Sequence, residues 1–290
     1  MKKQSTAGNS IWNPENPRVL SSEDRKFYEE AGYLVVKGIW SPKECDLILE
    51  YLNFFKDKNA SAMMNLDREY ALSRFWVQNY SQRNGIDIND IPVDKIPFEH
   101  INKTARLMRA FMRDPRAVSL LEQLHEGPFF GNVKGRQWGG LMTQIIFKEP
   151  ETQYGNQAWN PHQDNSYVLN PNRLYVTTNS FFADSDVENG TMYVYPGTHK
   201  EGILPYEEVV SYREEKGKNP GNITAIPEKY KRVDIEFKKG DMLFLNGDLV
   251  HGSYANKSKN RPRPLYMNVY IPEGEFFRPG KGSEKMFIPL

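Results

Sequence analysis

The sequence predicts an α+β fold, with helices in the first half of the chain and a sandwich or barrel of many strands in the second half. Two observations support this division. Up to residue 125, several segments repeat apolar residues at helical spacing. From residue 129 almost to the end, short apolar segments are separated by Gly, Pro and Asn turn signals. We therefore expect one domain, with a surface tail over 1–19, helical support and a lid over 20–128, and a strand core over 129–290.

The helical half carries clear start and stop signals. Ser21, followed closely by acidic residues, predicts a helix that ends at Gly32. Ser41-Pro42 predicts the start of a second helix, because proline is well tolerated in the first turn. A third helical region over 100–125 is interrupted at Asp114-Pro115.

Residues 59–97 lack a clear period. The aromatic residues Phe75, Trp76 and Tyr80 lie there, close to Arg74. They either contact a substrate or pack in the core, and the sequence leaves both alternatives open. Loops and insertions concentrate function, so this region and the polar insertion over 206–231 are candidates for a lid.

The strand half contains apolar segments of strand length, each bounded by turn residues. Asn189-Gly190, between two such segments, predicts a hairpin, and Pro196-Gly197 predicts a tight turn after it. The candidate strands are 141–148, 174–183, 192–195, 233–237, 242–246, 252–254 and 265–270.

Composition excludes several classes of protein. The 290 residues include 38 basic and 37 acidic side chains, and no basic stripe predicts binding to nucleic acid. No apolar run approaches the ~20 residues of a membrane span. The single cysteine, Cys45, rules out an internal disulfide and fits a reducing compartment. We expect a cytoplasmic enzyme with a small-molecule substrate, while the sequence gives no indication of oligomeric state.

The strongest chemical signal is His162-Gln163-Asp164 together with His251, which follows Asp164 by 251 − 164 = 87 residues. In an extended strand, side chains two residues apart leave the same face, so His162 and Asp164 can converge. Two histidines and one carboxylate form the facial triad of non-haem Fe(II) oxygenases. A His-X-Asp tripeptide alone is weak evidence, and a lone His251 is as readily a core histidine.

The other histidines are expected to have structural roles. His100 and His125 have no ligand-like neighbours and are interpreted as surface or capping residues. His199 follows the Pro-Gly turn, and we interpret it as a structural or surface residue rather than a fourth ligand.

Two arginines, Arg261 and Arg263, each precede a proline and are therefore extended. Their spacing of two places them on one face. A guanidinium near a metal can take a carboxylate through two parallel hydrogen bonds, as the far end of a 2-oxo dicarboxylate requires. Surface charge is the alternative for either residue.

Together these segments resemble the phytanoyl-CoA dioxygenase family of Fe(II)/2-oxoglutarate-dependent oxygenases, which have a double-stranded β-helix (jelly-roll, cupin-like) core. The resemblance extends in order over most of the chain and is weakest over 56–128. The segments that carry it are 27–38, 145–150, 159–164, 188–192, 196–200, 240–241 and His251-Gly252-Ser253 with Asn256 and Ser258.

The resemblance implies roles for individual residues. His162, Asp164 and His251 would hold iron, and Arg263, with Arg261 in reserve, would bind the distal carboxylate of 2-oxoglutarate. The family arginine usually stands eleven residues after the last histidine, where this chain has Pro262, so the match to Arg263 requires one inserted residue. Ser253 resembles the serine that assists that arginine. Gln144 and Asn179 stand where members contact co-substrate or substrate, although some members carry Trp at the position of Asn179.

The resemblance implies use of O2 and 2-oxoglutarate, with release of succinate and oxidation of a substrate C–H bond. Related halogenases carry a small residue in place of the carboxylate, so Asp164 favours hydroxylation, desaturation or cyclisation over halogenation, and hydroxylation is the expected reaction. A non-catalytic sensor and a cupin-type metal enzyme that uses no oxo acid remain alternatives. We expect a small free metabolite, such as a secondary-metabolism or amino-acid-like compound, because no basic patch is present for the phosphates of an acyl-CoA.

Overall fold

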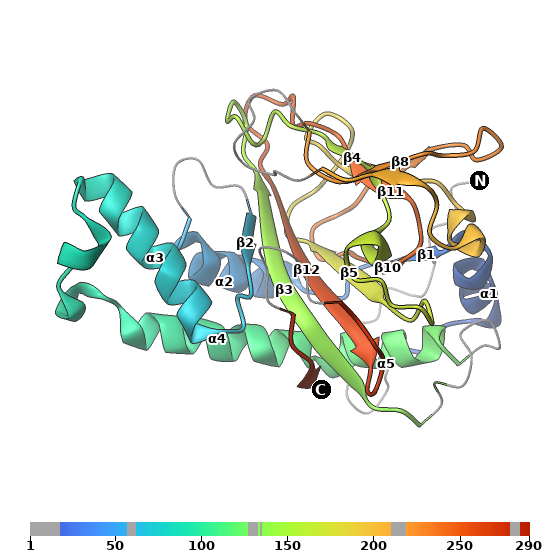
Figure 1. The fold of residues 1–290 in the computed structure, drawn as a ribbon, viewed down its shortest axis with the longest axis horizontal. Coiled ribbons are helices and arrows are strands. Elements are labelled where there is room, and N and C mark those ends of the chain that lie inside the picture. Colours follow the sequence, from blue (N-terminus) through green and yellow to red (C-terminus); the bar gives the residue numbers. More distant parts are fainter. Residues whose placement is uncertain (1–17, 57–61, 127–132, 134, 210–218, 279–284) are drawn as a thin grey trace.

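The computed structural model describes residues 18–56, 62–126, 133, 135–209, 219–278 and 285–290. Two antiparallel sheets form a sandwich, and helices from the first half of the chain cover the outer face of the larger sheet (Figure 1). Most of the predicted tail, and the part of the polar insertion from 210 to 218, lie outside the described residues. No helix in the described ranges is long and apolar enough to cross a membrane.

The larger sheet has the order β1-β10-β5-β12-β3-β13, and β2 also pairs with β3. The smaller sheet has the order β4-β11-β6-β9, and β7 pairs with β8. The strands are β1 (Tyr33–Val36), β2 (Ala62–Met64), β3 (Trp138–Lys148), β4 (Trp159–His162), β5 (Val176–Phe181), β6 (Met192–Val194), β7 (Tyr206–Glu207), β8 (Ile223–Thr224), β9 (Val233–Asp234), β10 (Met242–Asn246), β11 (His251–Ser253), β12 (Arg263–Pro272) and β13 (Ile288–Pro289).

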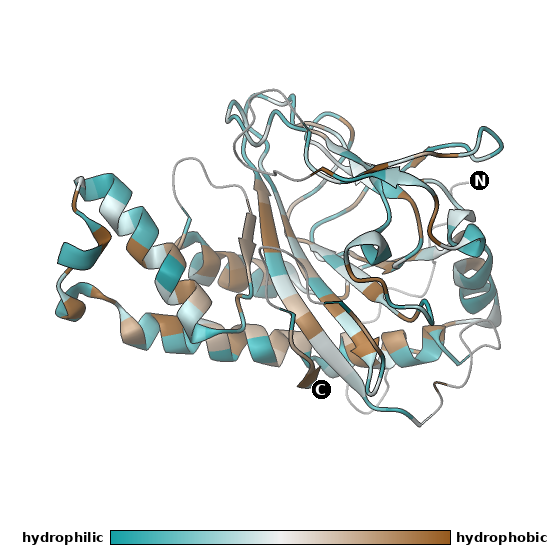
Figure 2. Cartoon of the chain, in the orientation of Figure 1, coloured by the Kyte–Doolittle hydropathy of each residue, from teal (hydrophilic) through white to brown (hydrophobic). Residues whose placement is uncertain are grey.

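The helices begin where the capping residues predict. Ser21 and Ser41 each form a capping box at the start of a helix, and Gly32 ends the first helix in the left-handed conformation. The helices are α1 (Ser22–Ala31), α2 (Pro42–Asn53), α3 (Glu69–Asn84), α4 (Phe98–Met112) and α5 (Pro115–Leu124). Figure 2 shows that hydrophilic residues dominate α1, whereas apolar residues recur along α2, α4 and α5, which pack on the sheet.

Alternation along the strands divides the buried residues between the two faces of the larger sheet. Ile145 and Phe147 of β3 pack outward against the helices, in the same cluster as Phe244 of β10. Leu243 of β10 and Leu265 of β12 point inward, toward the smaller sheet. The space between the two sheets is therefore reached by alternate residues of β3, β5, β10 and β12.

Residues 69–84 form a full helix, α3, within the region expected to be mainly helical; its apolar residues do not gather on one side, which is why the sequence shows no clear period there. Phe75 and Trp76 of α3 pack against the main core. One sequence expectation about the elements is wrong. The segment around Asn189-Gly190 is not a hairpin, because β5 lies in the larger sheet and β6 in the smaller one. It is a turn that carries the chain from one sheet to the other.

Two of the remaining histidines are buried rather than on the surface. His125 is the C-terminal cap of α5, and its Nδ1 lies 2.6 Å from the carbonyl of Leu121. His199 packs against Gly32 and its Nε2 lies 3.0 Å from the carbonyl of Glu29. Both interpretations are confirmed, with His125 as a capping residue and His199 as a structural residue, and neither side chain lies at the surface.

Candidate metal centre and neighbouring cation pair

His162, Asp164 and His251 converge on one point of the smaller sheet. His162 ends β4 and faces His251, the first residue of β11, across the antiparallel pair, with 4.4 Å between the ring centroids. Asp164 opens the short 3-10 turn after β4, so it is delivered by a turn rather than by the strand itself. Its Oδ1 lies 3.4 Å from Nε2 of His162 and 3.7 Å from Nε2 of His251. The three ligand atoms lie within 4.8 Å of one another, as a single metal ion requires.

The hydrogen bonds around the triad fix which atoms face its centre. Nδ1 of His162 lies 2.6 Å from the carbonyl of Asn160, and Nδ1 of His251 lies 3.0 Å from the carbonyl of Leu249. Because a carbonyl only accepts, each Nδ1 carries the proton and each Nε2 presents a lone pair to the centre.

The protonation states also suit a cation. Burial lowers the pKa of His251 to about 4, against the opposing effect of Asp164, so its ring is neutral at neutral pH. Burial opposes ionisation of Asp164, but His251, His162 and a hydrogen bond from Thr177 outweigh it and hold the pKa of the carboxyl below its usual range. Metal ligands must be deprotonated, and this donor set therefore fits a divalent ion without loss of a proton.

A pair of buried cations lies beside the metal centre. Lys148 ends β3 and stands opposite Arg263, the first residue of β12; their exposed fractions are 0% and 1%. Lys148 Nζ donates to Ser253 Oγ at 2.8 Å and to the carbonyl of Tyr254. Ser253 lies two residues after His251 on β11, so this bond joins the cation pair to the strand that carries a metal ligand.

The charge of the cation pair is not neutralised by the described part of the chain. Arg263 Nε donates to the carbonyl of Gly190 at 3.1 Å, but its buried Nη1 has no hydrogen-bond partner there. Burial lowers the pKa of Arg263 to about 10, and burial together with Arg263 lowers the pKa of Lys148 well below its usual value. A buried charge without a partner is costly, so this arrangement is suited to an anionic ligand.

Gln144 and Asn179 lie on the same inner face of the larger sheet. Met267 of β12 pairs with Gln144 on one side and with Asn179 of β5 on the other. Gln144 is four residues before Lys148 and therefore shares its side of the strand. Asn179 is buried, and its Nδ2 has no hydrogen-bond partner in the described ranges.

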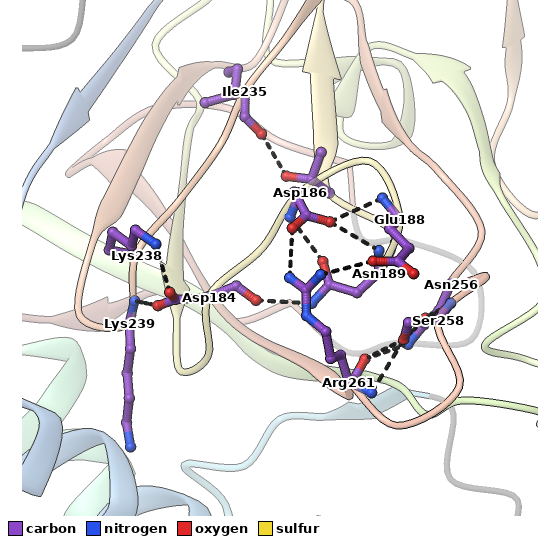
Figure 3. Close-up of polar contacts among 11 residues, drawn as sticks. Asp184, Asp186, Glu188, Asn189, Ile235, Lys238, Lys239, Asn256, Ser258 and Arg261 are labelled. Carbon is purple, nitrogen blue, oxygen red and sulfur yellow. Dashed lines mark hydrogen bonds and ion pairs between the residues drawn. The ribbon is translucent and has the colours of Figure 1, made fainter.

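Arg261 occupies a different environment from Arg263. Its guanidinium lies at the surface, 2.6 Å from Asp186 and 3.1 Å from Glu188, with 37% of the side chain exposed. Figure 3 shows this network, in which Asn256 and Ser258 hold the loop that carries Arg261. The two arginines therefore do not share one site, although their spacing of two predicted a common face.

The network around Arg261 holds the turn that leads to Gly190. Asp186 accepts a hydrogen bond from the backbone N–H of Glu188, and Asn189 bonds back to Asp184 and Asp186 (Figure 3). Gly190 has φ of +90°, and an added Cβ would lie 2.9 Å from the carbonyl of Tyr254. Glycine is therefore required where this turn presents its carbonyl to Arg263.

The sequence did not single out two residues of the site. Lys148 directly follows the apolar run Ile145-Ile146-Phe147. A lysine that ends such a buried strand is unusual, and this feature could have identified Lys148 as a site residue. Thr177 Oγ1 donates to Asp164 Oδ2 at 2.5 Å, and nothing in the sequence marks it.

Comparison with known proteins gives a consistent result. The family model described as Phytanoyl-CoA dioxygenase (PhyH) matches residues 28–264. A probable phytanoyl-CoA dioxygenase of Caenorhabditis elegans is 26% identical over 248 residues, which span 83% of this chain and 72% of that protein. The peroxisomal phytanoyl-CoA dioxygenase of Rattus norvegicus is 27% identical over 246 residues, 83% of this chain and 65% of that protein.

Solved structures share the fold at low identity. EctD from S. alaskensis has a TM-score of 0.59 at 16% identity, covering 97% of this chain and 86% of that chain. The epimerase SnoN in complex with Fe3+, alpha ketoglutarate and nogalamycin RO has a TM-score of 0.57 at 18% identity, covering 92% and 94%. The expected jelly-roll core is confirmed. The family model spans both the helical and the strand halves, and the protein therefore belongs to the phytanoyl-CoA dioxygenase family of Fe(II)- and 2-oxoglutarate-dependent oxygenases.

Proposed function

We propose that this oxygenase hydroxylates a C–H bond of a small organic metabolite, using iron at His162, Asp164 and His251. The observation that carries the proposal is the set of two histidines and one carboxylate beside a buried cation pair that has no acidic partner among the described residues. When bound, iron with 2-oxoglutarate and O2 supplies the oxidant, with decarboxylation of 2-oxoglutarate to succinate. The chain supplies the ligands, the orientation and a dry interior.

The cation pair holds the distal carboxylate of 2-oxoglutarate in this proposal. Arg263 offers its Nη1, which has no partner among the described residues, while Lys148 adds a second positive charge that Ser253 keeps in place. Gln144 and the unpaired amide of Asn179 line the interior near the pair and supply neutral hydrogen bonds to co-substrate or substrate. Arg261 takes no part in binding, since Asp186 and Glu188 already occupy its guanidinium.

Asp164 favours hydroxylation over halogenation, because the carboxylate occupies the position that a halide would need. The similar structures include the epimerase SnoN and the carbocyclase SnoK, so epimerisation and cyclisation are the reactions to test after hydroxylation. The curated relatives are named for an acyl-CoA substrate. We propose a free metabolite here, because the chain shows no basic patch for the phosphates of coenzyme A.

The described part of the polar insertion borders the metal centre at residues 220–222, and we propose this part as a lid. Asn160, two residues before His162, donates its backbone N–H to the carbonyl of Pro220 at 2.8 Å. Asn222 donates its backbone N–H to Tyr167 Oη at 2.7 Å, in the turn that carries Asp164. Helices α2, α4 and α5 pack on the outer face of the larger sheet, and we assign them support within a single domain. A cytoplasmic location, without nucleic acid or membrane partners, completes the proposal.

An anaerobic titration of metal-free protein tests the assignment. With Fe(II) and 2-oxoglutarate, we expect the weak visible charge-transfer band that iron gives with a bound 2-oxo acid. The band should be absent in His162→Ala. If iron binds but no band forms in the wild type, the protein is a cupin-type metal enzyme instead. If the band forms but succinate appears without product from any metabolite tested, a sensing role replaces catalysis.

A further inference from the structure

Asp248 is a buried carboxylate between the two metal-ligand segments. It lies after the end of β10 and three residues before His251, with 0% of its side chain exposed. Oδ2 accepts a hydrogen bond from Arg173 Nε at 2.6 Å, and Oδ1 accepts one from Asn165 Nδ2 at 2.8 Å. Asn165 directly follows Asp164 in the chain.

The contacts of this segment hold both neighbours of Asp164. Gln163 Nε2 donates to the backbone carbonyl of Asp248 at 2.6 Å, and the backbone N–H of Asn165 donates to the carbonyl of Gly247 at 2.8 Å. With the side-chain bond between Asn165 and Asp248, three hydrogen bonds tie the turn that carries Asp164 to the segment that leads into His251.

Arg173 fixes the carboxylate from the other side. It has a left-handed backbone, with φ of +62°, and its guanidinium joins Asp248 to the carbonyl of His199. Neither Arg173 nor Asp248 contacts the metal ligands directly. The hydrogen bonds among Arg173, Asp248 and Asn165 therefore do not supply a metal ligand, but they connect the two segments that carry the ligands to the rest of the fold.

We propose that Asp248, held by Arg173 and Asn165, is a positioning residue that sets the spacing of Asp164 and His251 before the metal binds. Groups behind the ligands commonly change metal affinity by about 10- to 100-fold when they are replaced. The inference rests on the proposed metal site, and it adds a residue through which the fold controls that site.

The test compares Asp248→Asn with Asp241→Asn. Asp241 is also a buried carboxylate, stands just before β10, and pairs with Lys37 at 2.8 Å, but lies away from the metal ligands. Asparagine at 248 keeps only one acceptor oxygen, so its NH2 group faces a donor, either Arg173 Nε or Asn165 Nδ2, whichever way the amide is turned. We measure the affinity for Co(II) by titration, the visible absorption of the bound Co(II), and the thermal unfolding of the metal-free protein.

We expect Asp248→Asn to weaken Co(II) binding by about 10- to 100-fold and to alter the Co(II) spectrum. Asp241→Asn should lower the unfolding temperature by a similar amount and leave both metal readouts unchanged. Equal Co(II) affinity in the two variants would overturn the inference. If Asp248→Asn does not fold, Arg173→Lys replaces it as the test. The side chain at 173 is partly exposed, and lysine there keeps the positive charge but lacks the planar guanidinium. Unchanged Co(II) affinity in Arg173→Lys would overturn the inference. Wild-type protein that binds no Co(II) would overturn the proposed function itself.

Discussion

Replacing Arg263 with methionine tests which of the two arginines, Arg261 or Arg263, binds 2-oxoglutarate. Within the described ranges, the buried Nη1 of Arg263 has no partner and can donate to a carboxylate, whereas Arg261 is already paired at the surface. A hydrogen bond to a charged group contributes about 1.5–3 kcal/mol. Loss of the guanidinium, with Lys148 still present, should therefore cost about 3 kcal/mol of binding free energy, which is roughly a 100-fold weaker affinity for 2-oxoglutarate.

The assay is an anaerobic titration of the Fe(II) protein with 2-oxoglutarate, followed by the visible band. Pyruvate, a 2-oxo acid without the distal carboxylate, is the matched ligand, and its affinity should not change in Arg263→Met. Arg261→Met is the matched variant, and loss of its exposed ion pairs should change 2-oxoglutarate affinity by less than about fivefold. The reasoning is refuted if Arg261→Met carries the loss, or if Arg263→Met weakens pyruvate and 2-oxoglutarate equally.

Two further predictions concern the metal site and the fold. Thr177→Val removes the hydrogen bond to Asp164 and keeps the side-chain shape, so Fe(II) affinity should fall by about tenfold; an unchanged Fe(II) titration would contradict this. Burial lowers the pKa of His199 to about 4. Between pH 6.5 and 4 the unfolded state therefore binds up to one more proton at this residue, and the free energy of unfolding decreases as the pH is lowered. His199→Gln should reduce the pH dependence of the free energy of unfolding by about 1.4 kcal/mol per pH unit. The measurement is urea unfolding at pH 7.5, 6 and 5, with His125 unchanged in both proteins. An unchanged pH dependence would show that His199 does not titrate on unfolding.

Local patterns predicted most elements of the fold. The strand predicted over 242–246 matches β10, because a buried strand bounded by Gly-Asp and Asn-Gly is marked at both ends by its own sequence. The bounds of helix α3 were not predicted within the region expected to be helical, because its apolar residues do not gather on one side. Its presence depends on contacts with α4 and the main core that are distant in sequence.

The site shows the same division between local and distant information. His162, Asp164 and His251 were identified from their ligand types and from the family resemblance, although Asp164 reaches the site from a turn and not from the strand that the spacing argument assumed. The choice between Arg261 and Arg263 could not be made from the sequence. It depends on which guanidinium pairs with Asp186 and Glu188, more than 70 residues earlier in the chain. Lys148 was missed for a related reason: a lysine is a surface residue by default, and only the register between β3 and β12 places it beside Arg263.

The charges of the described site suggest that its two ligands bind together. The cation pair is buried and only 14% of the Asp164 side chain is exposed, so charge interactions here are stronger than in water. A divalent ion alone would add positive charge beside two cations that are already unneutralised. A dianionic co-substrate alone would add negative charge beside Asp164. Added together, the two leave the total charge of the site as it was, so each should raise the affinity for the other by the same factor, as linkage requires.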